Sequence, residues 1–332
     1  MLSDTRFHDL PVLLLYNLDP AWSASERNEV TTLSAQLAQS LADEGHTAYP
    51  VPVEHSDLAA ILRPYDPAEH LVFNWCESYP GIPRSEPLIA RDLHEMGFVF
   101  TGAAHDALAL SQDKSTTKTT LARQAVPTPE GRIFTRPDVD GWTRYPAIVK
   151  TAYEHCSEGL TRDSVVTHEE ELKDRISFVL NTFQQPALVE DFIDGREFHV
   201  TLIGNGHPNM LPVAEMDFSR FSDFHDHLCS YEAKFTPGSS HYEGIQTLLP
   251  APLNDVELYA LEQVCHAAYQ TIGCRDYGRI DVRLRDGIYY VLDVNPNSDI
   301  SPDASTACAA EIAGYTYGPM ALSTRGHKYD DV

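Results

Sequence analysis

Apolar residues in the first hundred positions follow two alternating patterns. Short apolar runs are separated by segments with helical spacing, as in the helix that Ser25 is expected to cap and Gly45 to end. Such alternation predicts a parallel sheet with helices on its faces. The expected elements are strands at 11–17, 47–53, 70–75 and 98–101, and helices at 25–45 and 85–97.

The pattern changes after this segment, where antiparallel signals begin. Two capping boxes, Thr167-x-x-Glu170 and Asn254-x-x-Glu257, predict helix starts. Asn205-Gly206 predicts a tight turn between two strands. The expected elements are helices at 113–124, 167–181 and 254–273, and strands at 131–135, 145–151, 187–193, 197–203, 209–215, 276–285 and 288–295.

Three domains are the simplest partition of these elements. Residues 1–102 would form an N-terminal α/β domain and residues 103–189 a small central domain. Residues 190–332 would form a larger C-terminal domain with an antiparallel sheet. The expected fold class is therefore α/β, with an α+β part in the C-terminal half.

The last two strands carry the clearest chemical pattern. Residues 279–285 alternate strictly between charged and apolar side chains. On the partner strand, Asp293 and Asn295 share one face, so their oxygens can converge on a hard cation, and Asp281 would complete the set. The alternative is a hairpin whose polar face is only solvated.

The register of this hairpin tests the metal hypothesis. If Asp286-Gly287 formed a two-residue turn in a regular ladder, Asp281 and Asp293 would face opposite sides of the sheet. A shared metal site therefore predicts either a three-residue loop over 286–288 or a β-bulge that places Asp281 opposite Asp293.

Composition excludes some partners. The chain has 332 residues, with 24 Lys and Arg against 49 Asp and Glu, for a net charge of −25. This balance argues against a nucleic acid or an anionic membrane as partner, because both are bound mainly through basic side chains. No apolar stretch has the length of a membrane span, and no signal peptide pattern is present, so a cytoplasmic protein is expected.

Cysteines and histidines show no motif of a disulfide scaffold or a zinc site. Six cysteines are dispersed without a C-x-x-C pair, and no H-E-x-x-H spacing occurs among 15 histidines. We therefore expect reduced thiols and no zinc site.

Anion-binding candidates are few because the chain has only six lysines, at positions 114, 118, 150, 173, 234 and 328. Lys150 ends an apolar strand and precedes a polar stretch, 154–159, whose backbone N–H groups are suited to phosphates. Glu190 and Glu197 bracket a strand end and a turn that would suit a base and a ribose. Taken alone, residues of this kind are more often solvated surface charges than ligand-binding groups.

Together, these segments resemble the ATP-grasp ligases, and most closely the D-alanine–D-alanine ligase family. The resemblance spans nearly the whole chain and implies the three-domain ATP-grasp architecture. The segments that carry it, in order, are Phe100-Thr-Gly102, Ser111-Gln-Asp-Lys114 with Lys118, Val126-Pro-Thr-Pro129, Val149-Lys150, Leu188-Val-Glu190, Gly195-Arg-Glu197-Phe198, Tyr231-Glu-Ala-Lys234, Gly278-Arg-Ile-Asp281-Val282 and Leu292-Asp293-Val-Asn295.

The resemblance implies ATP as cosubstrate, two Mg²⁺ ions with Mn²⁺ as an alternative, and a role for each matched residue. ATP phosphates would be held by Lys114 and Lys150, and by Lys234 when its loop closes. Glu190 and the backbone of Ile193 would bind adenine, and Glu197 would bind ribose. The magnesium ligands would be Asp281, Asp293 and Asn295, with Arg279 stabilising the oxyanion.

Departures from the family's pattern cluster at positions that would face the substrates. The family's N-terminal Gly-Gly-x-Ser-Ala-Glu-Arg-Glu element occurs here without its glycines, so Glu26 and Glu29 are both candidates for the ammonium of the first substrate. The serine that usually supports this glutamate aligns with Cys156, beside Ser157, and the tyrosine of the closing loop aligns with Phe235. Two hydroxyls are therefore missing, and a buried polar group left without its partner costs about 1–3 kcal/mol.

A second departure follows Asn295. The family continues with Thr-x-Pro-Gly and a Ser-Leu pair, whereas this chain has Asp299 at the glycine and Asp303 shortly before Ser305, where an acceptor carboxylate should dock. Two carboxylates would repel a third. The hypothesis is that the acceptor is not D-alanine but a less anionic amine, such as a polyamine or a basic or modified amino acid. Alternatively, both aspartates point into solvent or pair with arginines.

The resemblance implies an ADP-forming ligase that joins a small-molecule carboxylate to an amine through an acyl phosphate, and a homodimer as its assembly. An authentic D-alanine–D-alanine ligase is one alternative. A nucleotide-binding pseudoenzyme is another.

Overall fold

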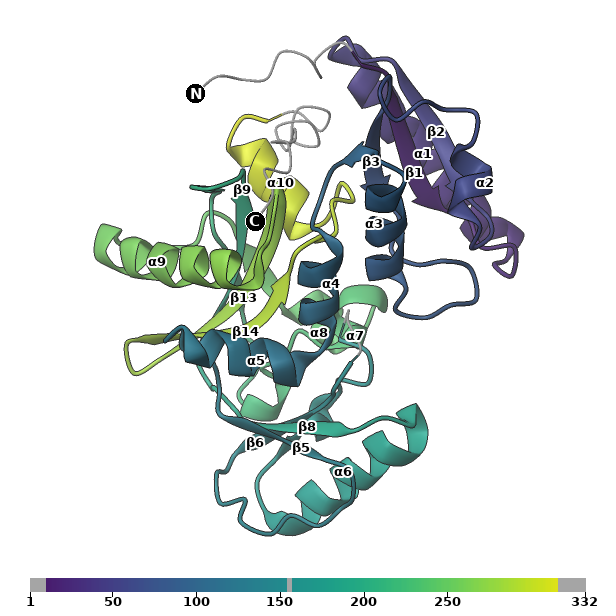
Figure 1. Ribbon diagram of the computed structural model, residues 1–332. Helices are drawn as coiled ribbons and strands as arrows, with labels where there is room; N and C mark the ends of the chain where they lie inside the picture. Colours follow the sequence, from purple (N-terminus) through teal and green to yellow (C-terminus); the bar gives the residue numbers. More distant parts are fainter. Residues whose placement is uncertain (1–9, 154–156, 316–332) are drawn as a thin grey trace.

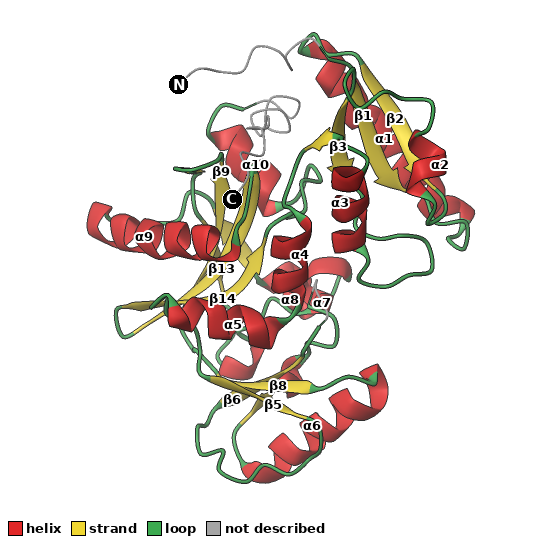
Figure 2. Cartoon of the chain, viewed as in Figure 1, coloured by secondary structure: helices red, strands yellow, loops and turns green. Residues whose placement is uncertain are grey.

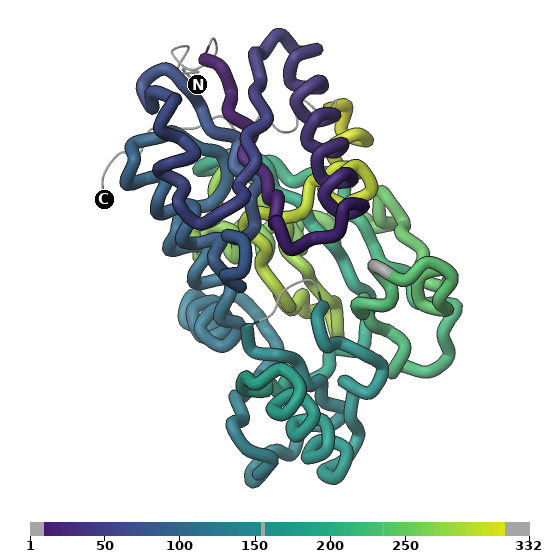
Figure 3. Tube along the Cα trace, turned by 90° about the vertical axis from the view of Figure 1, so that its right-hand side faces the viewer, coloured from purple at the N-terminus to yellow at the C-terminus, as the bar shows by residue number. Residues whose placement is uncertain are grey.

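The computed structural model describes residues 10–153 and 157–315 and places their strands in three sheets. Figure 1 shows the segment 10–100 at one end of the molecule and the segment 131–191 at the other. The turned view in Figure 3 shows the same order, with the remaining C-terminal elements between the two ends. The fold is a mixed α/β fold with one parallel and two antiparallel sheets, as the sequence predicted.

The N-terminal sheet is parallel, with strand order β2-β1-β3-β4. Apolar strand residues pack on both faces because helices and the rest of the chain cover them. Leu13 and Val72 contact the side of α3, whereas Leu14 and Phe73 join a core that includes Ile203 and Tyr277 from the C-terminal part. The elements are β1 (Val12–Asn17), α1 (Ala24–Asp43), β2 (Ala48–Val53), α2 (Leu58–Leu62), β3 (Leu71–Trp75), α3 (Glu86–Glu95) and β4 (Val99–Phe100).

Two helices, α4 (His105–Gln112) and α5 (Lys114–Arg123), connect this sheet to the rest of the chain. Asp113 caps α5 by accepting a hydrogen bond from the N–H of Thr116. Leu121 and Val126 pack in the core beneath α9, with Leu261 among their neighbours. Lys114 therefore stands at the first turn of a helix that is anchored to the C-terminal elements.

The second sheet has strand order β5-β8-β6-β7 and is antiparallel. Helix α6 covers it, and its buried side chains Leu172, Ile176 and Val179 pack on Val149 and Val189 (Figure 1). The elements are β5 (Gly131–Phe134), β6 (Ala147–Thr151), the 3₁₀ turn η2 (Arg162–Ser164), β7 (Val165–Val166), α6 (Glu169–Phe183) and β8 (Ala187–Asp191).

The third sheet is antiparallel along the path β12-β11-β9-β13-β14, with β10 pairing β9. Its apolar face packs on α9. Figure 2 shows this helix beside strands of the sheet. The elements are β9 (Arg196–Ile203), β10 (Asn209–Met210), β11 (Ala214–Asp217), η3 (Phe224–Asp226), α7 (Tyr231–Phe235), α8 (Ser240–Gly244), β12 (Gln246–Leu248), α9 (Asp255–Ile272), β13 (Tyr277–Arg285), β14 (Ile288–Asn295) and α10 (Ser305–Ile312).

Two predicted helix starts were wrong by one or two residues. Ser23, not Ser25, caps α1, because Ser23 and Glu26 form a reciprocal capping box. His168, not Thr167, caps α6, and Thr167 instead bonds the carboxylate of Glu171. In both cases several polar residues precede the helix, so the local sequence offered more than one cap.

The capping box at Asn254 and Glu257 is confirmed, and α9 ends at Gly273 with the left-handed backbone expected of a helix-ending glycine. Over the described residues, no helix combines the length and the apolar character needed to cross a bilayer.

Candidate active site

A cavity lies between the second and third sheets and is the candidate active site. It encloses about 870 Å³ of space, including its open mouth. Strands of both sheets line it, together with the start of α5 and the α7 segment. Nine of the residues singled out from the sequence line it: Lys114, Lys150, Ser157, Glu190, Ile193, Glu197, Lys234, Asp281 and Asp293.

Register explains how the final hairpin places its polar side chains. The turn is the tight two-residue type, because Asp286 and Gly287 both have positive φ and Arg285 pairs with Ile288. The ladder then shifts by one residue between Val282 and Asp281, so that Asp281 lies directly opposite Asp293. A β-bulge at this point supplies the register that the metal hypothesis requires.

The bulge is also visible in the apolar face of the hairpin. Ile280 and Val282 face the core two residues apart, whereas their partners Val294 and Val291 are three residues apart. The additional residue, Leu292, lines the cavity beside Asp293. The bulge therefore keeps both valines in the core while turning Asp293 toward Asp281.

Two rows of paired residues cross the strands at the candidate metal position. In one row, His199 on β9 pairs with Asp281 on β13, which pairs with Asp293 on β14. In the next row on the same face of the sheet, Arg279 pairs with Asn295. Directly paired residues project to the same side of a sheet, so these side chains share a face.

Arg279 holds Asp281 by two hydrogen bonds, from Nε at 2.7 Å and from Nη2 at 2.9 Å. Burial alone would raise the pKa of Asp281, but the Arg279 guanidinium lowers it below its ordinary value. Asp281 is therefore an anion in the folded chain. Nδ2 of Asn295 donates to Oδ2 of Asp281 at 3.4 Å, and Asp293 is the direct cross-strand partner of Asp281.

Arg283 is the main residue of this site that sequence analysis missed. It is 2% exposed, and its guanidinium donates to Oε2 of Glu197 at 2.7 Å and to the carbonyl of Ile193 at 2.8 Å. It also donates to the carbonyl of His227 and lies over the ring of Phe192. One cation thus joins β9, the β8–β9 linker and the segment before α7.

Glu197 is ionised because of these contacts. Burial by itself would raise its pKa, but Arg283 and His199 lower it well below the ordinary value. In the sequence, the alternation of residues 279–285 placed Arg283 on the charged face but offered no sign of its partner 86 positions away.

Glu190 is fully buried between two lysines. Lys150 lies 2.8 Å from Oε2, and Lys118 pairs with Oε1. Lys118 also donates to Oγ1 of Thr128 at 3.0 Å. Burial lowers the pKa of Lys150 to about 8, and it lowers that of Lys118 as well. Lys118 belongs to a motif that carries the family resemblance but had no predicted role, and it lies against Glu190, which lines the cavity.

Lys234 reaches the opposite wall of the cavity. Its Nζ donates to Oγ of Ser157 at 2.9 Å, and Ser157 in turn donates to the carbonyl of Cys229 at 2.8 Å. The backbone N–H of Lys114 donates to the carbonyl of Ala152 at 3.2 Å, which ties α5 to the same loop. Three separate segments therefore bring lysines to one cavity.

Of the described candidate substrate residues, Ser157 lines this cavity, whereas Glu26, Asp299, Asp303 and Ser305 do not. Glu26 is exposed and accepts a hydrogen bond from the N–H of Ser23 at 2.7 Å as part of the α1 cap. Asp299 is exposed and accepts from the N–H and hydroxyl of Ser301 at 2.8 and 2.7 Å. Asp303 is exposed, and Ser305 begins α10. Cys156 lies outside the described residues.

A polar seam joins the segment after β14 to the N-terminal elements. Nδ2 of Asn297 donates to Glu86 at 2.7 Å, and Oδ1 of Asn297 accepts from the N–H of Ala103 at 2.8 Å. Gly102 permits this approach, since a Cβ there would lie 2.5 Å from Asn297. Burial raises the pKa of Glu86 to about 8. Asp299 follows two residues after Asn297, at the edge of this seam.

Solved structures share the fold of this chain. A D-alanine–D-alanine ligase from Bacillus anthracis superposes with a TM-score of 0.71 at 17% identity, over 95% of this chain and 96% of that chain. The same ligase complexed with ATP gives a TM-score of 0.72 at 16% identity, with the same coverage. The fold is that of the ATP-grasp D-alanine–D-alanine ligases.

Sequence comparison establishes the family. The family described as D-ala D-ala ligase C-terminus matches residues 124–320, and the chain belongs to it. A D-alanine–D-alanine ligase from Pseudothermotoga lettingae is 26% identical over 283 residues, covering 85% of this chain and 88% of that protein. The uncharacterized protein y4sG from Sinorhizobium fredii is 31% identical over 256 residues, covering 75% and 72%. This protein is therefore an ATP-grasp ligase of the D-alanine–D-alanine ligase type.

Proposed function

We propose that the protein is an ADP-forming carboxylate–amine ligase whose amine substrate is less anionic than D-alanine. The observation that carries the reaction type is the convergence of lysines, buried carboxylates and paired oxygen donors on one cavity between two sheets. The observation that bears on the substrate is the pair of exposed aspartates, Asp299 and Asp303, after β14.

ATP fits the distribution of charge around the cavity. Lys114, Lys150 and Lys234 would hold the phosphates, since each comes from a different element and all line the same cavity. Glu197 would accept the ribose hydroxyls while Arg283 fixes its orientation. Glu190 and the backbone of Ile193 would bind adenine beside them.

Mg²⁺ fits the donor set at the bulge. Asp281, Asp293 and Asn295 offer hard oxygen donors on one face of the hairpin, which is the ligand type that Mg²⁺ prefers. Bound there, magnesium would neutralise charge on the transferring phosphoryl group. Two ions are the proposed number, and Mn²⁺ would suit the same oxygen donors.

The residues present suit acyl transfer through an acyl phosphate. A substrate carboxylate attacks the γ-phosphate, releasing ADP, and an amine then displaces phosphate from the activated carbonyl. Lys234 neutralises phosphoryl charge, and its contact with Ser157 holds its loop against the opposite wall, where it would exclude water. Arg279 would stabilise the oxyanion, since it has donors beyond the two given to Asp281. One such donor contributes about 3–4 kcal/mol in comparable sites.

The amine preference rests on charge. Asp299 stands where the family has a glycine, and the hydrogen bonds from Ser301 hold its carboxylate at the seam. An amino-acid carboxylate approaching Asp299 and Asp303 would be repelled, whereas a cationic or neutral amine would not. Glu26 or Glu29 would bind the ammonium of the first substrate.

An ADP-release assay tests the proposal. The purified protein is incubated with ATP, Mg²⁺ and a panel of amines and amino acids that includes polyamines, lysine, arginine and D-alanine. We expect turnover with cationic or neutral amines and little with D-alanine alone. Strong turnover with D-alanine as sole substrate would make the protein an authentic D-alanine–D-alanine ligase.

Two further outcomes separate the remaining possibilities. ATP binding without any ADP release would indicate a nucleotide-binding pseudoenzyme. Variants D299G and D303A test the substrate determinant, because removing the two carboxylates should increase turnover with acceptors that carry a carboxylate. The homodimer is tested separately by light scattering of the purified protein.

A further inference from the structure

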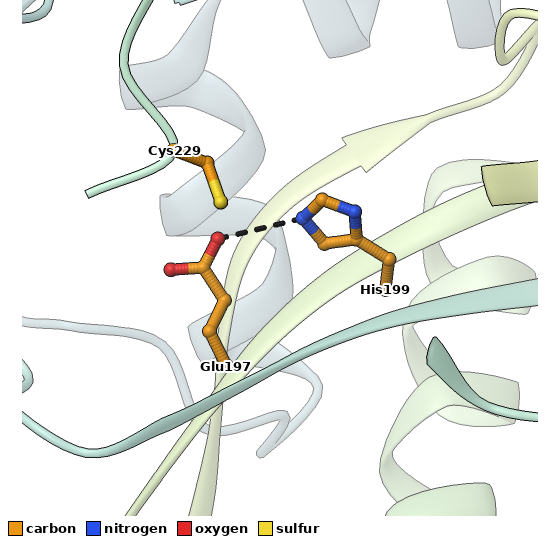
Figure 4. Close-up of side chains that lie close together, drawn as sticks. All are labelled: Glu197, His199 and Cys229. Atoms are coloured by element: carbon orange, nitrogen blue, oxygen red, sulfur yellow. Dashed lines mark ion pairs between the residues drawn. The ribbon is translucent and has the colours of Figure 1, made fainter. Parts of the chain in front are cut away.

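Three side chains with different donor atoms converge beside the proposed ribose position. One ligand atom each of Glu197, His199 and Cys229, an oxygen, a nitrogen and a sulfur, all lie within 4.8 Å of one another. Figure 4 shows the thiol and the imidazole directed at the same carboxylate. Nε2 of His199 lies 3.4 Å from Oε1 of Glu197.

The fold brings these residues together from two segments. Glu197 and His199 are two apart on β9, so they project from the same face of the strand. Cys229 directly precedes Ser230, the N-cap of α7. Glu197 and His199 are 5% and 8% exposed, and all three residues line the cavity.

This donor set differs from the oxygen-only set at the bulge. Nitrogen and sulfur ligands favour zinc and similar borderline or soft metal ions, whereas oxygen ligands favour magnesium. Zinc binds sulfur at about 2.3 Å and nitrogen or oxygen at about 2.0–2.2 Å, so small side-chain rotations would bring all three donors within reach.

We propose that Glu197, His199 and Cys229 form a binding site for zinc or a chemically similar divalent ion, and that this ion competes with ATP for the cavity. Competition rests on the proposed function, in which Glu197 binds ribose, but ion binding itself does not.

Arg283 prepares Glu197 for such an ion. It bonds Oε2 and leaves Oε1 directed toward His199. Carboxylates that bind metals are commonly oriented by a second hydrogen bond of this kind. On binding, the thiol of Cys229 releases its proton to solvent and the thiolate sulfur bonds the metal, so the reaction is ion plus thiol giving complex plus proton.

Spectroscopy of the full-length protein with Co²⁺ tests ion binding without any turnover. Cobalt substitutes for zinc in such sites, and a cobalt–thiolate bond gives a charge-transfer band in the near ultraviolet. We expect this band in the wild-type protein, its displacement by Zn²⁺ and its persistence in excess Mg²⁺. C229S should abolish the band, and H199A should weaken Co²⁺ binding by about tenfold or more.

Matched controls come from the same chain. The control variants are C308S and H207A. Cys308 on α10 donates to the carbonyl of Pro302 and His207 is exposed, so neither substitution should change the cobalt spectrum. Absence of a thiolate band in wild type, or its retention in C229S, would overturn the site. The fold of each variant is checked by its thermal midpoint, and C229A serves as a second variant if C229S is destabilised.

Nucleotide binding tests the competition. We expect Zn²⁺ to raise the apparent Kd of a fluorescent ATP analogue by about tenfold or more in the wild type. In C229S, the Kd of the analogue should be the same with and without Zn²⁺. If spectroscopy shows zinc binding but Zn²⁺ does not raise the Kd of the analogue, competition with ATP is rejected while the ion site still stands. Failure of ADP release with every substrate would reject the proposed function without affecting the cobalt result.

Discussion

Arg283 on β13 and Glu197 on β9 form a buried ion pair in which Nε lies 2.7 Å from Oε2. The same guanidinium donates to the carbonyl of Ile193, in the linker between β8 and β9. The pair therefore fixes the Glu197 carboxylate and the linker between β8 and β9 relative to each other. Under the proposed function, Arg283 would position the groups that bind ribose and adenine.

Replacing Arg283 should weaken ATP binding more than it slows chemistry. In R283M, Glu197 would keep a buried charge without its partner, which costs about 3–5 kcal/mol of stability. We expect the KM for ATP to rise by about tenfold or more with a smaller change in kcat, and R283K to restore part of the affinity. Steady-state kinetics of ADP release measures both constants.

A matched control is R285M on the same strand. Arg285 pairs with Asp191, donates to the carbonyl of Phe192 and is 31% exposed, so its loss should raise the KM for ATP less than the loss of the buried Arg283 does. The double variant R283M/E197Q removes both charges and should recover stability while ATP binding stays weak. Equal effects of R283M and R285M on KM would contradict the positioning role.

The metal donors should be required for turnover. D293N removes a carboxylate that lies opposite Asp281, so the site loses charge but keeps its shape. We expect kcat/KM to fall by about two orders of magnitude and the Mg²⁺ concentration for half-maximal rate to rise. D286N, at the exposed turn of the same hairpin, is the control and should match the wild type. A normal Mg²⁺ titration in D293N would show that the bulge serves packing alone.

Lys150 should make ATP use dependent on pH. Its pKa is lowered to about 8 by burial, so the ammonium loses its proton as pH rises through about 8 and phosphate affinity is lost above that value. We expect kcat/KM for ATP to decline above pH 8 in the wild type. K150R keeps its charge and should show a flatter profile, whatever its absolute rate. The same decline in both proteins would assign the titration to another group.

Gly195 should be required for the linker conformation. A Cβ at this position would lie 1.9 Å from the carbonyl oxygen of Leu284, so G195A must displace backbone between Ile193 and Glu197. We expect a loss of about 1–3 kcal/mol of stability and weaker ATP binding. G287A is the control. A Cβ at Gly287 would have no neighbouring atom within 4 Å, so only the positive φ of this residue would be strained. Thermal unfolding and nucleotide titration measure the two effects, and unchanged ATP affinity in G195A would contradict this role of the linker.

Much of the fold could be predicted from local patterns. Period-two alternation in residues 279–285, the capping box at Asn254 and the turn residues Asp286-Gly287 each determine conformation over a few positions. Helix starts were less certain, as at Ser23 and His168, because neighbouring polar residues offered equivalent caps.

For the candidate site, the sequence by itself determined the types of residue: a few lysines, two aspartates and an asparagine on one hairpin, and two glutamates around a linker. Tertiary structure decided their pairing. The bulge that sets Asp281 opposite Asp293, and the contact of Arg283 with Glu197, join residues that are distant along the chain. Local propensity acts over a few residues, whereas strand register and burial depend on how whole sheets pack, so these contacts have no local signature.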